Sequence, residues 1–213
     1  MNPRARRIVD TAIDLAEKGG FEAVRLRDVA AEADVALGTL YRYFRSKEDM
    51  LIAALAAEVE SLEVRIAARP MPGASSLERV DAFFRAATKG LMRRPRLTRA
   101  ILRAAASGDH ELAEKVAAFH SRMSAMILAA MHGRPVETEA AAAGNGSPPS
   151  VAALAASKDE LAVAAMLQHI WFSCLIGWAG GLMNQNEVIE RMSTATELLT
   201  RAVPETSHGE SKR

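Results

Sequence analysis

The sequence has little of several features that define other protein classes. A single cysteine, Cys174, excludes an internal disulfide framework and a zinc site built from several cysteines. Aromatic residues make up only 5% of the chain, and stretches rich in Val, Ile or Thr are few, which disfavours a β-sheet protein. The net charge is +1, so the total gives no sign of the basic excess that nucleic-acid-binding proteins usually have.

What is present indicates a helical globular protein. Alanine supplies 42 of the 213 residues, and 49% of the chain is apolar against 25% charged. The N-terminus has no apolar signal-peptide core, so we expect a cytoplasmic protein. Residues 161–183 are apolar over nearly the length of a membrane span, but Gln168 and His169 interrupt them. We interpret that segment as a helix buried in a core or dimer interface, and expect no membrane partner.

Signals for helix ends divide the chain into segments. Ser75, Ser157 and Asn184 each precede a glutamate by three residues, the spacing of a capping box at a helix start. Glycine and proline pairs follow most of the periodic segments and mark their ends. The pattern predicts an all-α protein with helices at about 3–18, 26–33, 37–44, 47–68, 75–93, 95–106, 109–132, 158–183 and 186–201.

Two short helices near the N-terminus have the spacing of a helix-turn-helix. Leu26, Val29 and Ala30 form the inner stripe of a two-turn helix, and Leu40 continues that core after a tight corner. Asp34 lies at the corner, where Asp tolerates a left-handed backbone better than most residues. In this motif the second helix enters the major groove of DNA.

The residues of this motif resemble the TetR family of transcriptional regulators. The match covers about residues 5–55 and is carried chiefly by Val35-Ala36-Leu37-Gly38-Thr39-Leu40-Tyr41-Arg42-Tyr43-Phe44 and Ser46-Lys47-Glu48. The resemblance implies a DNA-binding domain over residues 1–47 and a ligand-binding and dimerisation domain over 48–203. Within the second domain we expect a flexible insert at 134–157, and beyond it a disordered tail at 204–213.

The resemblance also implies which residues contact DNA. Gly38 has no side chain to keep the backbone away from DNA, while Arg42 and Leu37 can read a guanine edge and a thymine methyl. Arg25 stands where the family commonly has a small hydroxyl residue, so its role is open. The predicted DNA-binding residues are Arg25, Arg27, Leu37, Gly38, Thr39, Tyr41, Arg42, Tyr43 and Lys47.

The rest of the chain resembles a narrower branch of the family. Residues 94–100 and 171–178 are similar to the actinobacterial regulators of cholesterol catabolism, which implies a ligand such as a sterol-derived acyl-CoA. Residues 82–108 contain seven cations and no acid, and this basic run is either a site for CoA phosphates or a solvated face neutralised by acids from elsewhere. The predicted ligand-binding residues are Phe83, Phe84, Arg96, Arg99, Phe119, Met123, Met126, Ile127, Met166, Ile170, Trp171 and Leu175.

The last two predicted helices are candidates for a dimer interface. Two such helices from each subunit would form a four-helix interface. The expected contact residues are Gly177, Trp178, Gly181, Leu182, Leu198 and Leu199.

Other functions fit less well. Residues 110–114 are a near miss for a zinc-protease helix, because Glu114 replaces the second histidine, and we expect no metal, cofactor or catalytic residue. A homodimeric repressor of a near-palindromic operator is the preferred interpretation. A regulator of efflux that senses hydrophobic drugs is one alternative, and an enzyme acting on a CoA thioester is another. The near-zero net charge is not evidence against a DNA partner. Residues 1–9, 36–47 and 82–108 contain cations and no acid, and the excess acids that cancel their charge lie elsewhere in the chain.

Overall fold

The computed structural model describes residues 1–135 and 156–201, and every regular element in these two ranges is helical. The predicted all-α class is confirmed. The predicted insert and tail fall largely on 136–155 and 202–213, outside the described residues. The elements in chain order are α1 (Pro3–Gly19), η1 (Phe21–Ala23), α2 (Leu26–Glu32), α3 (Leu37–Tyr43), α4 (Lys47–Ala68), α5 (Ser76–Met92), α6 (Pro95–Ala105), η2 (His110–Leu112), α7 (Ala113–His132), α9 (Lys158–Ala179) and α10 (Gln185–Thr200).

Local side-chain chemistry explains most helix ends. All three predicted capping boxes are present, at Ser75, Ser157 and Asn184, and each satisfies backbone N–H groups that a helix start leaves free. Two predicted bounds were wrong. The helix α9 ends at Ala179 rather than 183, because the chain turns at Gly181 with φ +78°. The helix predicted from 109 begins with the 3₁₀ turn η2, and α7 starts only at Ala113.

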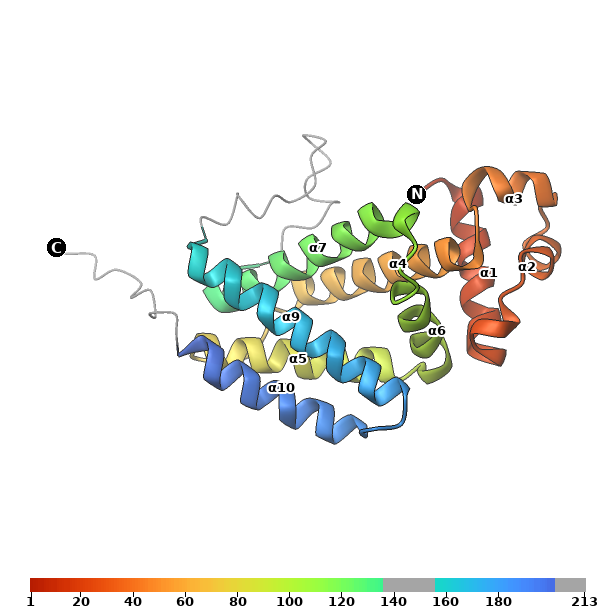
Figure 1. Ribbon diagram of the computed structural model, residues 1–213. Coiled ribbons are helices and arrows are strands. Elements are labelled where there is room, and N and C mark those ends of the chain that lie inside the picture. Colours follow the sequence, from red (N-terminus) through yellow and green to blue (C-terminus); the bar gives the residue numbers. More distant parts are fainter. Residues whose placement is uncertain (136–155, 202–213) are drawn as a thin grey trace.

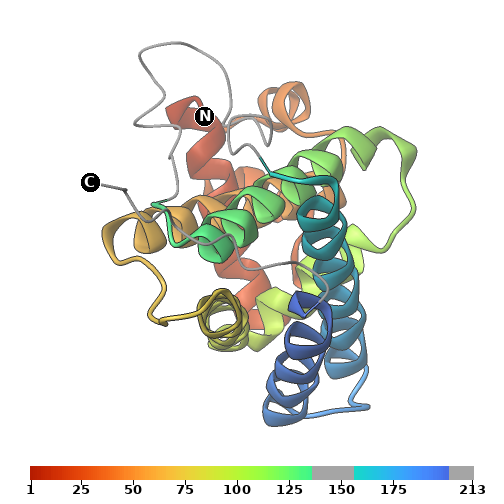
Figure 2. The same ribbon diagram turned by 90° about the vertical axis from the view of Figure 1, so that its left-hand side faces the viewer.

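The helices form two groups joined along α4 and α6. Helices α1, α2 and α3 gather at one end of the molecule, and we call this group the head (Figure 1). The N-terminal part of α4 packs against α1, and α6 packs against both α1 and α4. On the other side of this junction α5, α7, α9 and α10 form a bundle in which α10 lies against α5 and α9 (Figure 2).

One apolar core runs through both groups. It extends from Ile8 in α1 to Met192 in α10, and both side chains are inaccessible or nearly so. The helix α9 is long and apolar enough to span a membrane by length and composition alone. Half of its most apolar window is buried inside the structure, as expected for a helix that packs against α7 and α10.

Candidate nucleic-acid interface and ligand cavity

The corner between α2 and α3 has the geometry predicted for a helix-turn-helix. Asp34 adopts φ +50°, and the N–H of Val35 donates to the carbonyl of Ala30 at 3.0 Å, which closes the turn. Leu40 is fully buried and Phe44 nearly so, and these two side chains anchor α3 on the head. The opposite face of α3 is therefore free to meet a partner.

The predicted DNA-binding residues divide into an exposed and a half-buried group. Tyr41 is 53% exposed. A Cβ added at Gly38 would meet no atom within 4 Å, so packing inside the protein does not require glycine there, and the space lies open for an approaching partner. The exposed group is Arg25, Arg27, Gly38, Tyr41 and Arg42, and the half-buried group is Leu37, Thr39, Tyr43 and Lys47.

A polar hollow lies beside α3. It is lined by the N-terminal residues of α1, including Arg4 and Arg7, and by Tyr43 from the end of α3. The guanidinium of Arg7 also donates to the carbonyl of Asp34 at 3.3 Å, so α1 supports the corner of the motif. The hollow therefore brings two cations and a phenol hydroxyl together next to the recognition helix.

Lys47 belongs to a cluster that we call the Glu22 clasp, formed by Phe21, Glu22, Lys47 and Arg103. The Lys47 Nζ lies 3.3 Å from the Glu22 carboxylate and 3.9 Å from the centre of the Phe21 ring. Arg103 reaches the same two groups from α6, at 2.9 Å and 4.1 Å. The hydrogen bond and charge of Lys47, with a smaller effect of Arg103, lower the pKa of Glu22. Lys47, a predicted DNA contact, is thus linked to α6 through Glu22 and Phe21.

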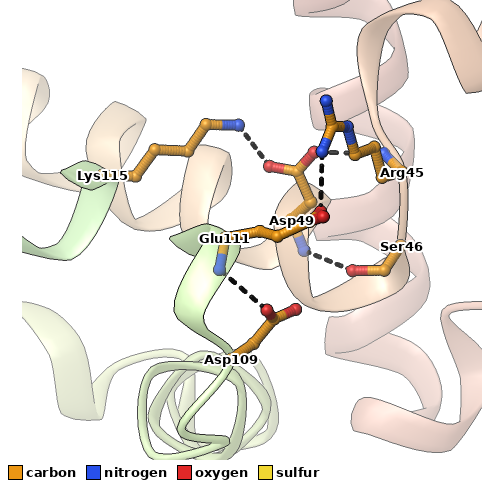
Figure 3. Close-up of polar contacts among 6 residues, drawn as sticks. All are labelled: Arg45, Ser46, Asp49, Asp109, Glu111 and Lys115. Atoms are coloured by element: carbon orange, nitrogen blue, oxygen red, sulfur yellow. Dashed lines mark hydrogen bonds and ion pairs between the residues drawn. The ribbon is translucent and has the colours of Figure 1, made fainter. Parts of the chain in front are cut away.

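A second cluster joins the head to α7 (Figure 3). The buried carboxylate of Asp49, at the start of α4, accepts from the Arg45 N–H at 3.1 Å and forms an ion pair with Lys115 of α7. The Arg45 guanidinium lies 2.8 Å from Glu111 in η2. We call this group of Arg45, Asp49, Glu111 and Lys115 the α7 junction.

Between the head and the far end of the bundle lies an internal cavity of about 150 Å³. It is lined mainly by apolar side chains from five helices. The lining residues are Leu55, Glu58, Val59, Leu62 and Arg65 of α4, Ala87, Gly90 and Leu91 of α5, Thr98, Ile101, Leu102 and Ala105 of α6, Val116, Phe119, His120 and Met123 of α7, and Gln168, Trp171, Phe172 and Leu175 of α9.

The structure brings four of the predicted ligand-binding residues to this cavity, namely Phe119, Met123, Trp171 and Leu175. The other apolar candidates lie elsewhere. Phe83, Phe84, Met126 and Ile127 are buried against neighbouring helices and do not reach the cavity wall, while Met166 is 52% exposed and Ile170 is half-buried outside the lining. Trp171 is held in place by a hydrogen bond of 2.9 Å from its indole N–H to Thr88.

The two predicted arginines also lie outside the lining. Arg96 donates to the carbonyl of Lys18 at the end of α1, and the Arg99 guanidinium stacks 4.7 Å from the Trp178 ring centre. Sequence reasoning missed the charged residues that do line the cavity, Glu58 and Arg65, because both lie on α4 outside the basic run.

The basic run of residues 82–108 is partly neutralised within the chain. Arg85 pairs with Asp81 at 2.6 Å, Arg94 with Glu58 at 2.6 Å, and Arg103 joins the Glu22 clasp. Arg94 also pairs with Glu17. In the part of the chain that the structure describes, Lys89, Arg93, Arg96 and Arg99 have no acid partner. Arg96 and Arg99 have the carbonyl and ring contacts given above, whereas Lys89 and Arg93 have neither. The arrangement favours neutralisation by acids for three of the seven cations and leaves Lys89 and Arg93 open.

Polar groups interrupt the apolar wall of the cavity. Burial raises the pKa of Glu58, and the nearby charge of Arg65 partly offsets this. The amide of Gln168, only 4% exposed, contacts the imidazole of His120. Such groups decide which ligand fits, because an occupant that leaves a buried polar group unpaired is penalised.

The predicted dimer residues include the most exposed leucines of the bundle. Leu182 is 84% exposed and Leu198 62% exposed, although leucine is usually buried. Gly181 is exposed and Leu199 half-buried, whereas Trp178 is buried. Gly177 is also buried, and a Cβ there would lie 2.8 Å from the Met183 Cε of the same chain, so a larger residue would require the Met183 side chain to move.

Comparison with protein families and known proteins shows which proteins the chain resembles. A model described as "Bacterial regulatory proteins, tetR family" matches residues 8–54, and one described as "Tetracyclin repressor-like, C-terminal domain" matches 73–144. The transcriptional repressor KstR of Rhodococcus jostii is 36% identical over 196 residues, which is 92% of this chain and 82% of that protein. Both parts of the chain therefore match regulators.

Solved structures show the same fold. A TetR transcriptional regulator from a Rhodococcus species superposes with a TM-score of 0.76 at 23% identity, covering 94% of this chain and 97% of that one. The regulator FadR of Bacillus subtilis, solved in complex with stearoyl-CoA, superposes with a TM-score of 0.63 at 17% identity and covers 93% and 99%. The chain is a regulator and not an enzyme, and it belongs to the TetR family of transcriptional regulators.

Proposed function

We propose that this repressor holds a near-palindromic operator as a homodimer and releases it when an acyl-CoA thioester with a large apolar acyl group enters the cavity. The observation that carries the proposal is the position of the cavity. Its walls include α4 and α6, which pack against α1 of the head, and α7, which is tied to the start of α4 by the Lys115–Asp49 ion pair. The similarity to KstR, and the resemblance of residues 94–100 and 171–178 to regulators of cholesterol catabolism, support a sterol-derived acyl group.

The free face of α3 is the proposed reading surface. Arg42 and Leu37 contact bases, whereas Thr39, Tyr41, Tyr43 and Lys47 bind phosphates, with Arg25 and Arg27 of the preceding segment beside them. Gly38 permits close approach of the backbone. In a dimer acting in the cytoplasm, the two α3 helices would read major grooves about 34–36 Å apart or a multiple of that distance.

Helices α9 and α10 form the proposed dimer interface. Leu182 and Leu198 expose apolar surface that a second copy of the chain would bury, and the two helices from each subunit would make a four-helix bundle. Trp178 and Leu199 would extend the contact beneath these leucines, and Gly177 and Gly181 keep the local backbone free of bulky side chains.

The proposed switch follows from the small size of the cavity and from α6 and α7, each of which both lines the cavity and holds an ion-pair cluster beside the head. At about 150 Å³ the cavity is smaller than the roughly 300–1,000 Å³ of typical ligand pockets, so a large acyl group has to displace its walls. On α6, Ile101 lines the cavity and Arg103 holds the Glu22 clasp. On α7, Val116 lines the cavity and Lys115 holds Asp49. Ligand entry therefore favours a conformation in which the spacing of the two heads no longer matches the operator. The ligand can shift this equilibrium only by as much free energy as its affinity differs between the two conformations.

The CoA phosphates require cations near the cavity. Arg65 lines it, and the open cations Lys89 and Arg93 flank Gly90, another lining residue. Arg96 and Arg99, both exposed on α6, complete the proposed basic surface. The drug-sensing alternative gains less from the structure, because the acid in the lining, Glu58, is already paired with Arg94.

Operator release at fixed salt tests this function. A fluorescent operator duplex is titrated with the CoA thioester of a steroid carboxylic acid, with CoA alone and with a lipophilic cationic dye. We expect release by the thioester only, and weaker thioester binding in the double variant Arg96→Ala with Arg99→Ala. Operator binding that no thioester changes would refute the switch, and unchanged thioester affinity in the double variant would refute the basic surface.

A further inference from the structure

A pair of neighbouring polar side chains lies among apolar residues in the wall of the cavity. His120 comes from α7 and Gln168 from α9, and both side chains line the cavity next to Phe119, Met123 and Trp171. Gln168 is 4% exposed, so its amide has to find partners within the protein. Its neighbours are the His120 ring, the His120 carbonyl and Ser124.

The Gln168 amide satisfies more of these neighbours in one orientation than in the other. With the nitrogen toward His120, it donates to the His120 carbonyl and to Nδ1, both at 3.1 Å. The oxygen then accepts from the Ser124 hydroxyl at 2.6 Å and from the Ser124 N–H at 3.3 Å. In the reverse orientation the amide oxygen would face a carbonyl and the amide nitrogen an N–H, so two donors and two acceptors would oppose each other.

This orientation fixes the tautomer of His120. Because Nδ1 accepts a hydrogen bond from Gln168, the neutral ring bears its proton on Nε2. Among the described residues Nε2 has no hydrogen-bond partner. The His120 ring, which lines a cavity whose wall is largely hydrocarbon, thus has one N–H donor without a partner among the described residues.

We propose that His120 determines ligand specificity by donating from Nε2 to an acceptor oxygen in the apolar body of the effector. The inference rests on the proposed function and narrows the effector to molecules whose buried part has a carbonyl or ether oxygen, such as a ring ketone. A fully hydrocarbon body would cover the donor without pairing it, and sites built around a hydrogen bond reject such analogues. Gln168 is a positioning residue, because it acts only through the His120 ring.

Two matched thioesters test the proposal on the full-length protein. One is the CoA thioester of a steroid carboxylic acid with a ring ketone, and the other has that ketone reduced to a methylene. Trp171 lies in the cavity wall, so quenching of tryptophan fluorescence reports binding. We expect the wild type to prefer the ketone about tenfold, the ratio that one hydrogen bond of ordinary strength gives.

Substitutions of His120 separate the effect of its N–H donor on the ketone preference from the effect of its ring shape. In His120→Phe the preference should fall to about one, because the ring is kept and the donor is lost. In His120→Gln it should persist, since the side-chain amide places a donor near the position of Nε2. The control is His169→Phe, an exposed ring 5.9 Å from His120 that does not line the cavity, and the preference should not change there.

The tautomer itself is measurable by ¹⁵N NMR of the histidine side chains. The expected spectrum shows Nε2 of His120 protonated and Nδ1 unprotonated. A proton on Nδ1, or equal binding of the two thioesters by the wild type, would overturn this inference and leave the proposed function intact. Failure of both thioesters to bind would overturn the proposed effector class and this inference with it.

Discussion

The head and the cavity differ in how well candidate functional residues can be identified from their residue types. In the head, the proposed partner lies outside the protein, so a candidate residue is one that stays exposed at a fixed register on a short helix, as Tyr41 and Arg42 do. In the cavity, the residues that face the empty space and those that pack against a neighbouring helix are equally apolar and equally buried. Met123 and Met126 on α7 illustrate this, since both are buried and only Met123 lines the cavity. Candidates for a DNA-binding surface can be named residue by residue from the sequence, whereas a cavity is a property of several helices at once.

The largest expected effect tests the head. Arg42→Ala removes the proposed guanine contact, and loss of one bidentate contact typically costs about 1–3 kcal/mol, which is roughly a tenfold to hundredfold loss of operator affinity. Fluorescence anisotropy with the operator and with a scrambled duplex should show loss of discrimination between them. Lys18→Ala, an exposed cation at the end of α1, is the control. Equal losses on both duplexes would place Arg42 on the phosphates instead.

A smaller effect is expected from filling the cavity. A Cβ at Gly90 would meet only the Arg65 side chain, at 3.6 Å, so Gly90→Met can add its side chain to the cavity without a backbone clash. We expect thioester affinity to fall about tenfold, in line with the 1–3 kcal/mol cost of overpacking, while operator affinity is unchanged. The result is a repressor that no longer responds to its effector.

The matched control for this variant is Ala86→Met, on an exposed position of the same helix. Thioester binding should be normal there. If Gly90→Met left thioester affinity unchanged, the ligand would bind elsewhere, and the comparison between a surface site and an internal site would fail.

The same contrast explains how much of the structure the sequence could predict. Helix ends are set by near neighbours, so the capping serines and the Asp34 corner were predicted at single-residue accuracy. Contacts between distant segments were not predicted. Nothing in the local sequence shows that Glu22 pairs with Arg103, or that Arg96 binds the carbonyl of Lys18, because these pairs form only when α6 packs on α1.

A substitution in the α7 junction should moderately weaken the coupling between thioester binding and operator release. Lys115→Met leaves the buried Asp49 carboxylate without its ion pair, and half-exposed pairs of this kind contribute about 1 kcal/mol. We expect a small loss of stability in urea denaturation and, more informatively, weaker release of the operator by bound thioester. Lys158→Met, at the exposed start of α9, serves as the control. Normal release in Lys115→Met would show that the Lys115–Asp49 ion pair does not transmit the signal, and would leave α4 and α6 as the routes.

The smallest expected effect is on the pH dependence of stability, where Glu58 of the cavity wall is compared with Glu22 of the Glu22 clasp. Burial raises the pKa of Glu58 in the cavity wall, so the folded state holds this proton at pH values where the unfolded chain has lost it. As the pH rises from the ordinary glutamate pKa through the raised one, the free energy of unfolding should therefore fall relative to that of Glu58→Gln. Urea denaturation of both proteins across the acidic range measures the difference.

Glu22 should show the opposite sign. Lys47, and to a smaller extent Arg103, lower its pKa, so its contribution to stability is present above the ordinary glutamate pKa and is lost as the pH falls through the lowered one. Compared with Glu22→Gln, the wild type should therefore lose stability on acidification, whereas compared with Glu58→Gln it should gain. The cause of the contrast is position: Glu22 is exposed beside two cations, and Glu58 is taken out of water to form part of a cavity wall. Two slopes of the same sign would mean that the charges of Arg94 and Arg65 together outweigh burial at Glu58.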